Sequence, residues 1–329
     1  MYHKFLLLII ISPLILSLTV NETLYNILKQ NAQYEIVDYN ELFSNKDNPD
    51  IKLLNQSIEK KISIIDIINI AETIATFVVD LVTLASSLTI KDSTWDKVPK
   101  KYDFRDEHVT FTLPFPQREC ESGSAYAAAL STSYRRSLNV KDARHLSGIT
   151  IMEHYGKCKK INSVDAFRFV HEVGILEYPC RDQTYFEGLK YDDCVSYDER
   201  IGGFYTTKTT TYKCNEVYGI KGKKQIKYEI FTYGPVVTSF KFYSDFLYYK
   251  SGYYDFVDGE YLGSHEAVIV GWDENGWIAQ NFFGTNWGEN GFFRVKFDNN
   301  IGFGEIAFAS SGFIYFKMVL FTFLVVVIF

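Results

Sequence analysis

The sequence predicts an α+β protein with two lobes, a mainly helical lobe over about residues 123–199 and a β-rich lobe over about residues 206–309. Three motif-bearing segments carry this prediction, and they lie at residues 117–127, 263–268 and 280–292. The composition agrees with a globular protein, because 47% of the residues are hydrophobic and 17% are aromatic, which is ample for a core.

The charge of the chain argues against a nucleic-acid-binding protein. The formal net charge is −6, and no segment concentrates Lys and Arg. Phosphate backbones are bound by clusters of these basic side chains. We therefore expect no nucleic-acid partner, and we expect neither a cofactor nor a metal ion.

Residues 1–19 have the features of a secretory signal peptide. A short basic start that ends at Lys4 is followed by an apolar run over residues 5–18. This run is too short to favour a spanning helix over a cleaved signal peptide, and an uncleaved anchor is the alternative. In both cases the body of the protein enters the secretory pathway, where the sequons at Asn21 and Asn55 are candidate glycosylation sites.

Residues 20–97 are interpreted as a pro-segment-like region that contains a long amphipathic helix. Residues 21–60 are polar, rich in Asn and without a clear period. From Ile62 to Ile90 polar residues recur mostly three or four positions apart among aliphatic ones, which predicts a helix with one narrow polar stripe. Carboxylates along that stripe argue against a membrane span. The helix is either the core of an N-terminal subdomain or, as its position favours, a pro-segment that lies over the rest of the molecule.

Residues 310–329 are interpreted as a hydrophobic membrane anchor or a GPI signal. The stretch 313–329 is apolar except for Tyr315, Lys317 and Thr322, and such a run is costly to expose to water. Its length is near that of a membrane span. The small residues at 309–312 resemble a GPI attachment site with a short spacer, and a tail anchor is the alternative.

Several motifs between positions 98 and 309 follow one another in a characteristic order. The motif at residues 117–127 matches the pattern Q-G-x-C-G-S-C-W-A-F, and the motif at residues 280–292 matches N-S-W-G-x-x-W-G-x-x-G. Together the motifs resemble the papain family of cysteine peptidases, with the closest local similarity to cathepsin B. The resemblance implies the two-lobed α+β papain-like fold over residues 98–309, with a cleft between the lobes. The motifs lie at residues 98–106, 117–127, 243–252, 263–268 and 280–292.

The resemblance implies a nucleophilic cysteine at position 123, where this chain has Gly123. In the family, a Cys at a helix N-terminus is kept as a thiolate by the helix dipole and a His, which later protonates the leaving amine. An Asn orients that His, and a Gln side chain contributes to the oxyanion hole. The matching residues are retained as His265, Asn281 and Gln117.

Two further departures from the pattern accompany Gly123. Ser124 stands where the family has Trp, and its side chain would point about 100° round the helix axis from position 123, away from His265. Phe283 replaces an indole beside Asn281. We therefore expect Ser124 not to act as a substitute nucleophile, and we expect the Asn281–His265 hydrogen bond to be less well shielded.

All five cysteines lie between positions 120 and 214, which in an oxidising compartment indicates disulfides with one thiol left over. The resemblance implies a Cys120–Cys158 disulfide. Cys180 and Cys194 are the expected second pair, because a short loop separates them. No partner is assigned to Cys214.

The predicted function is that of a proteolytically inactive papain homologue, secreted or membrane-tethered, that binds a peptide, glycan or protein partner through the cleft or its surface. One alternative is an active peptidase with displaced chemistry, and another is a structural surface protein on the same fold. Residues 180–214 contain no histidine, so the paired-histidine occluding loop of cathepsin B and its dipeptide-removing activity are not expected. The expected location is a lysosome- or vacuole-like compartment or the cell surface.

Overall fold

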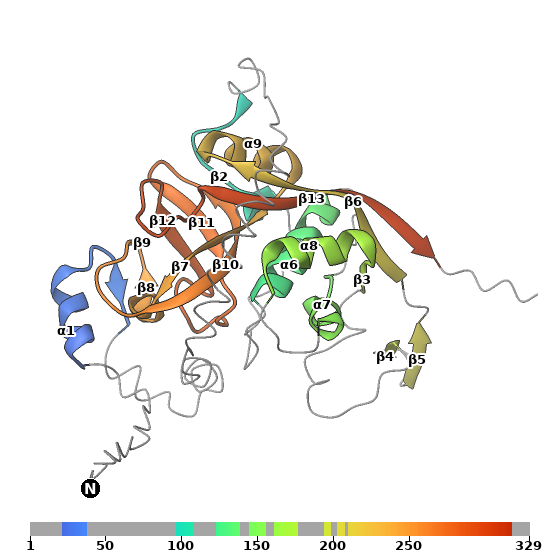
Figure 1. The fold of residues 1–329 in the computed structure, drawn as a ribbon, viewed down its shortest axis with the longest axis horizontal. Coiled ribbons are helices and arrows are strands. Elements are labelled where there is room, and N and C mark those ends of the chain that lie inside the picture. The colour runs from blue at the N-terminus through green and yellow to red at the C-terminus, as the bar shows by residue number, and fades with distance from the viewer. Residues whose placement is uncertain are drawn as a thin grey trace, which may run out of the picture.

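The computed structural model describes residues 22–37, 97–107, 123–138, 145–155, 161–176, 194–198, 203–207 and 210–317. In these ranges helices lie beside one large mixed sheet, which confirms the α+β class (Figure 1). The predicted signal peptide, the helix over residues 62–90 and the sequons at Asn21 and Asn55 lie outside the described residues.

Three helices form the helical part: α6 (Gly123–Ser137), α7 (Gly148–His154) and α8 (Ser163–Glu172). The first half of α6 is rich in Ala, which favours a helix and lets neighbouring elements approach closely on every side. At the start of α8 the side chain of Asn162 accepts a 2.7 Å hydrogen bond from the Asp165 amide, as an N-cap residue does. The predicted helical lobe is therefore present in these residues.

The main sheet has nine strands, and most neighbours in it are antiparallel. Its order is β3-β6-β13-β7-β10-β11-β12-β9, with β2 paired to β10. Strands β6 and β13 run past the helices, and β7 and β10–β12 form the β-rich part (Figure 1). The strands are β2 (Tyr102–Asp103), β3 (Ile175–Leu176), β6 (Thr210–Lys221), β7 (Val236–Tyr243), β9 (Tyr253–Tyr254), β10 (Tyr261–Trp272), β11 (Gly276–Gln280), β12 (Phe292–Lys296) and β13 (Ile306–Lys317).

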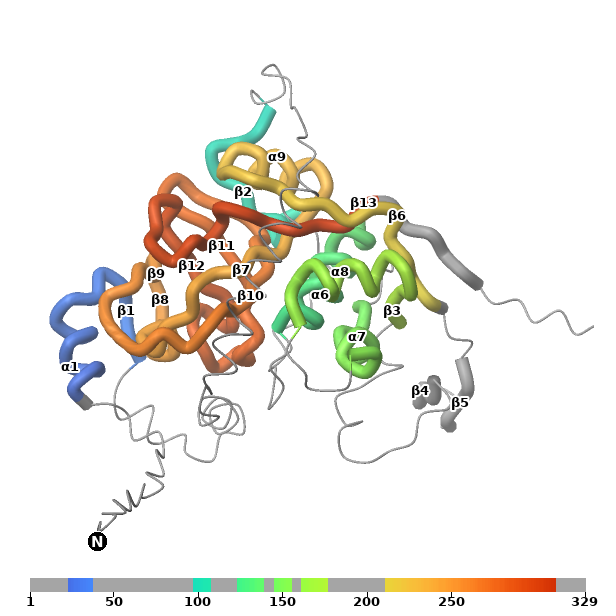
Figure 2. Tube along the Cα trace, viewed as in Figure 1, coloured from blue at the N-terminus to red at the C-terminus, as the bar shows by residue number. Residues whose placement is uncertain are grey.

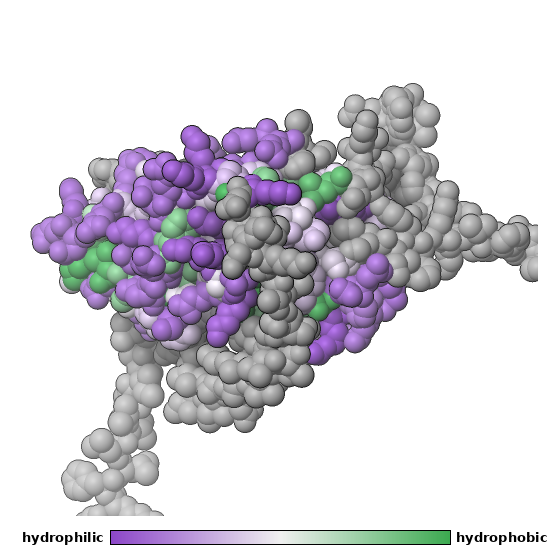
Figure 3. All heavy atoms as spheres, turned by 90° about the horizontal axis from the view of Figure 1, so that it is seen from above, coloured by the Kyte–Doolittle hydropathy of each residue, from purple (hydrophilic) through white to green (hydrophobic). Residues whose placement is uncertain are grey.

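Smaller elements complete the described chain. The aromatic residues between Tyr243 and Tyr254 contribute to the core, in which Phe246, Tyr249 and Tyr254 are fully buried. Seen from above, the surface is mostly hydrophilic, with hydrophobic side chains in separate small patches (Figure 3). The smaller elements are α5 (Phe104–Glu107), β4 (Cys194–Asp198), β5 (Gly203–Thr207), α9 (Lys223–Tyr233), η3 (Ser244–Tyr248) and β8 (Tyr249–Ser251).

A buried ion pair ties α6 to α9. Arg135 Nη2 lies 2.5 Å from Glu229 Oε1, and both side chains are only 2% exposed. Arg135 also donates to the carbonyl oxygens of Gly234 and Ser310, at 3.0 and 2.7 Å. A charged pair out of water is stable only when its remaining donors are satisfied in this way.

The N-terminal segment contains two elements that the sequence did not predict, α1 (Glu22–Asn31) and β1 (Glu35–Ile36). The interpretation of residues 21–60 as lacking a period is wrong for its first part. Leu24, Tyr25 and Leu28 lie on one helical face and are buried. The apolar face of α1 is short, and Asn and Gln residues lie around it in the sequence. Its pattern therefore gives only a weak helix signal without the surface on which it packs.

Strand β13 continues past the predicted end of the domain at Ala309. Its pairing with β6 runs to Lys317, which lies opposite Thr210. Part of the apolar run assigned to the anchor is therefore strand, because β6 supplies backbone partners along its whole length. Residues 318–329 lie outside the described part of the chain, and within that part no helix is long and apolar enough to cross a membrane.

Candidate functional site

His265 and Asn281 meet across the hairpin of β10 and β11. The antiparallel register pairs Val268 with Gln280, which places Asn281, just after β11, beside His265 on β10. His265 Nε2 lies 2.8 Å from Asn281 Oδ1. An amide oxygen can only accept, so Nε2 carries the hydrogen and Nδ1 is the nitrogen that could take a proton from a nucleophile.

The position of Asn281 is fixed from several sides. Its side chain is fully buried, and its backbone amide donates to the Gly291 carbonyl at 2.9 Å. The preceding side chain, Gln280, accepts a hydrogen bond from Tyr134 of α6. Helix α6 and the end of β11 are therefore linked directly next to the His–Asn pair. Among the described residues, Asn281 Nδ2 and Trp287 Nε1 are buried donors without an acceptor.

Three phenyl rings surround the imidazole. The ring of Phe283 stacks on His265 with centroids 5.0 Å apart and an interplanar angle of 29°. Phe242 and Phe240 lie at 5.2 and 5.6 Å. His265 is 6% exposed and Asn281 0%. The His–Asn pair is therefore shielded from solvent, and Phe283 supplies one of the rings on the imidazole.

Helix α6, which begins at Gly123, packs against β10, the strand that carries His265. The N-terminus of a helix carries partial positive charge and would favour a thiolate, but Gly123 provides no side chain there. The next residue, Ser124, is 1% exposed, and its hydroxyl donates a 2.7 Å hydrogen bond to the Ile161 carbonyl. This hydroxyl is engaged with the helical part of the molecule, which supports the expectation that Ser124 is not a nucleophile.

The remaining predicted site residues are described only in part. Gln117, Cys120, Cys158 and Cys180 lie outside the described residues, and Cys194 is described only as backbone in β4. The structure thus brings together His265 and Asn281 from the predicted set. Within the described ranges no group of three or more His, Cys, Asp or Glu side chains is arranged to hold a metal ion.

Cys214 is a free, buried thiol in β6. Burial raises its pKa to about 12. A thiol is nucleophilic only as the thiolate, so Cys214 is not a substitute for a cysteine at position 123.

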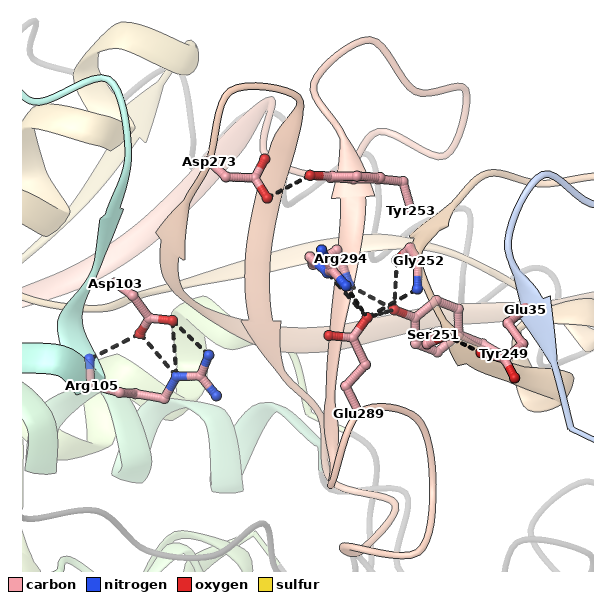
Figure 4. Close-up of polar contacts among 10 residues, drawn as sticks. All are labelled: Glu35, Asp103, Arg105, Tyr249, Ser251, Gly252, Tyr253, Asp273, Glu289 and Arg294. Carbon is pink, nitrogen blue, oxygen red and sulfur yellow. Dashed lines mark hydrogen bonds and ion pairs between the residues drawn. The ribbon is translucent and has the colours of Figure 1, made fainter.

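A polar cluster around Glu289 was not predicted from the sequence (Figure 4). Glu289 Oε1 accepts hydrogen bonds from Tyr249 Oη at 2.9 Å, the Gly252 amide at 3.0 Å and Arg294 Nη2 at 2.9 Å. It therefore joins the loop after Asn281 to β8 and β12. The sequence feature that could have indicated the role of Glu289 is its position directly after the Trp-Gly pair of the last motif. The rings of Phe240 and Phe242 gave no such signal, because each reads as an ordinary strand residue.

The sequence profile of the family described as "Papain family cysteine protease" matches residues 98–312. "Cathepsin B-like cysteine proteinase 3" of Caenorhabditis elegans is 41% identical over 105 residues, which cover 28% of each chain. "Gut-specific cysteine proteinase" of the same organism is 40% identical over 97 residues, 26% of this chain and 30% of that protein. These two matches thus span less than a third of the relatives' own length. "Cathepsin B-like cysteine proteinase 1" of Ostertagia ostertagi is 28% identical over 258 residues, 66% of this chain and 74% of that protein.

Two solved structures show the same fold. "proCathepsin B S9 from Trypanosoma congolense" superposes with a TM-score of 0.55 at 22% identity, covering 68% of this chain and 81% of that one. "Recombinant stem bromelain precursor" gives a TM-score of 0.53 at 18% identity, covering 68% and 74%. The predicted papain-like fold is confirmed. Because the family profile also spans more than half of the sequence, this chain belongs to the papain family of cysteine proteases.

Proposed function

We propose that this chain is a papain-family protein without thiol-dependent peptidase activity that binds a peptide, glycan or protein partner at the predicted cleft. The observation that carries the proposal is Gly123 at the first position of α6, beside a strand that still holds His265 on Asn281. The family reaction needs a thiolate to attack the peptide carbonyl. A glycine has no atom that can form this bond.

Neighbouring nucleophiles do not replace the missing thiol. The Ser124 hydroxyl donates to a carbonyl of the helical part, and Cys214 is a buried, protonated thiol in β6. Removing the nucleophile of a catalytic unit lowers turnover by about 10⁶-fold in a well-studied protease, and the remaining rate comes from binding and the oxyanion hole. We therefore infer negligible turnover for this chain.

The retained pair of side chains supports a role in binding. Buried polar side chains are costly unless hydrogen-bonded, and His265 and Asn281 share one hydrogen bond inside an aromatic surround. The pair holds this geometry without a thiol at position 123, which supports a use of the site other than hydrolysis. We propose a location in the secretory pathway, in a lysosome- or vacuole-like compartment or at the cell surface, with membrane attachment through the C-terminal residues.

The test uses the purified full-length chain. We expect no hydrolysis of cathepsin-type fluorogenic peptides and no labelling by thiol-directed epoxide or vinyl-sulfone probes. We also expect immobilised peptides of cathepsin-substrate type to bind, and His265→Ala to weaken that binding. Labelling within residues 123–124 would show that displaced chemistry exists. Absence of peptide binding by the wild type would instead favour the purely structural role.

A further inference from the structure

Helix α9 carries two lysines over one phenyl ring. Lys223 and Lys227 stand four positions apart, so they share one side of the helix. Their Nζ atoms lie 4.8 and 4.1 Å from the centroid of the Phe297 ring, and Lys227 Nζ is also 5.4 Å from the ring of Trp272. Figure 2 shows α9 at the top of the molecule, close to β2. Two ammonium groups are thus brought to one small aromatic surface.

The two rings belong to the core of the β-rich part. Trp272, the last residue of β10, is fully buried. Phe297 follows β12 and meets the ring of Trp277 edge-on, with centroids 5.1 Å apart and an interplanar angle of 86°. The Phe297 amide also donates to the Asn275 carbonyl at 3.2 Å. A shift of the rings away from the two amines would therefore disturb the packing of β10, β11 and β12.

The charges around Lys227 leave its ammonium form poorly compensated. The first turn of α9 contains no acidic residue. The carboxylate whose charge acts on Lys227 is that of Asp273, in the turn between β10 and β11. Its oxygens accept hydrogen bonds from Tyr253 Oη at 2.5 Å (Figure 4) and from the Asn275 and Gly276 amides at 2.9 and 3.0 Å. Asp273 is thus engaged by its own turn and by Tyr253.

Burial and repulsion together favour the uncharged amine of Lys227. The side chain is half-buried. Burial and, next, repulsion from Lys223 lower its pKa to about 8, and attraction to Asp273 offsets only part of this shift. Of the charged groups on the elements packed against α9, these two act on the amine. An aromatic ring favours the ammonium form of a lysine, but here Phe297 serves two of them.

We propose that Lys227 is a site of covalent acyl modification, at which its uncharged amine accepts an acyl group from a small thioester. The cluster of two amines on one ring, with the neighbouring carboxylate engaged elsewhere, distinguishes Lys227 from the exposed Lys224 of the same helix turn. Lys227 also retains exposed surface, which a reagent from solvent needs. This assignment does not depend on whether the His–Asn site hydrolyses or binds peptides.

The reaction is a simple acyl transfer. The lone pair of Nζ attacks the carbonyl carbon of the thioester, the C–S bond breaks, and the sulfur leaves as a thiolate. The nitrogen releases a proton to water, and a neutral amide remains on Lys227. About a quarter of the Lys227 side chains are uncharged at pH 7.5, against about one in a thousand for a lysine with an ordinary pKa near 10.4.

The experiment treats the folded full-length chain at pH 7.5 with the acetyl thioester of N-acetylcysteamine, at a dose that adds less than one acetyl group per chain. Peptide mass spectrometry measures the rate at each lysine. We expect Lys227 to be acetylated at least about tenfold faster than Lys224, because its larger uncharged fraction outweighs its lower basicity. The preference should disappear in urea. Equal rates at Lys227 and Lys224 in the folded protein would overturn the proposal.

Matched variants test the cause of the preference. Lys223→Gln removes the repelling charge and is expected to slow acetylation of Lys227, whereas Lys224→Gln, at an exposed position of the same turn, should leave the rate unchanged. The pH profile of the wild type needs no variant. The rate at Lys227 should level off above about pH 8, and a rate that continues to rise toward pH 10 would contradict the assignment.

Discussion

The imidazole of His265 donates a 2.8 Å hydrogen bond from Nε2 to Oδ1 of Asn281, and both residues are buried although position 123 offers no thiol. The pair is placed by the β10–β11 hairpin and covered by phenyl rings, and neither feature depends on residue 123. The ordered His–Asn pair therefore does not require a thiol at position 123. The placement of the His–Asn pair and the presence of a thiol at position 123 are thus separable properties of the site.

Gly123→Cys is expected to create a reactive thiol. The new side chain would stand at the N-terminus of α6, where the helix dipole stabilises a thiolate. We expect epoxide labelling at position 123 and peptide turnover above the wild-type background, measured with a fluorogenic substrate. Adding His265→Ala should lower that turnover by about 10²–10⁴-fold, as removal of a general acid–base does. A variant that folds but is not labelled would show that the site has lost more than its thiol.

The buried Arg135–Glu229 pair is expected to be a strong determinant of stability. Glu229→Ala leaves a guanidinium that is 2% exposed without its carboxylate, and breaking such a pair costs about 3–5 kcal/mol in the free energy of unfolding. The surface pair of Arg168 and Asp165, at 2.8 Å with side chains 46% and 32% exposed, is the control. Asp165 also helps to start α8, so the control variant is Arg168→Ala, for which we expect less than about 1 kcal/mol. Urea unfolding of both variants measures the difference, and equal costs would contradict it.

Cys214 is expected to make stability fall at alkaline pH. Burial raises its pKa to about 12, whereas a thiol in an unfolded chain titrates near about 8.5. Between these values the unfolded state releases the proton and the folded state keeps it, so this contribution is complete below about pH 8.5 and is lost as the pH rises toward 12.

The measurement for Cys214 is the free energy of unfolding against pH for the wild type and Cys214→Ala. The wild type should lose stability more steeply above about pH 8.5. Parallel curves would argue against the prediction. Native Cys214 should also resist iodoacetamide at pH 8 and react once the protein is denatured, because its side chain is 1% exposed.

The C-terminal residues are expected to attach the protein to membranes without GPI processing. Cleavage at residues 309–312 would remove the strand residues 313–317 that pair with β6. Phosphatidylinositol-specific phospholipase should therefore not release the protein, whereas deletion of residues 318–329 should release it without changing its thermal unfolding. Recovery of the intact chain, Phe329 included, from the aqueous phase without detergent would contradict this prediction.

Motifs made the His–Asn pair predictable from the sequence. The Gly-Ser-His-Glu-Ala and Gln-Asn segments stand at opposite strands of one hairpin, so local register brings their side chains together. The full aromatic cover could not be predicted, because Phe242 reaches the imidazole from β7, a strand distant in sequence from the His–Asn hairpin motifs.

Long-range pairing explains what the sequence could not predict. Helix α1 and strand β1 are short, and their stabilising partners in η3 and β8 lie more than two hundred positions further along the chain. Short elements of this kind have little intrinsic stability, so their own residues carry only a weak signal. The end of the domain was misplaced for a related reason. The apolar residues after Ala309 pair with β6, a strand whose alignment with them no local pattern reveals.

The hydrogen bond between Tyr134 and Gln280 has an evolutionary consequence. It ties α6 to the residue before Asn281, so the amide that orients the imidazole is anchored by the core and not by the reaction. One nucleotide change converts a cysteine codon to a glycine codon, and at the first position of α6 such a change would leave this anchor intact. Changes at Asn281 or Gln280 would instead disturb the folded state itself. Descendants of such a chain can lose the reaction in one step and still inherit the rest of the site, ready for another use.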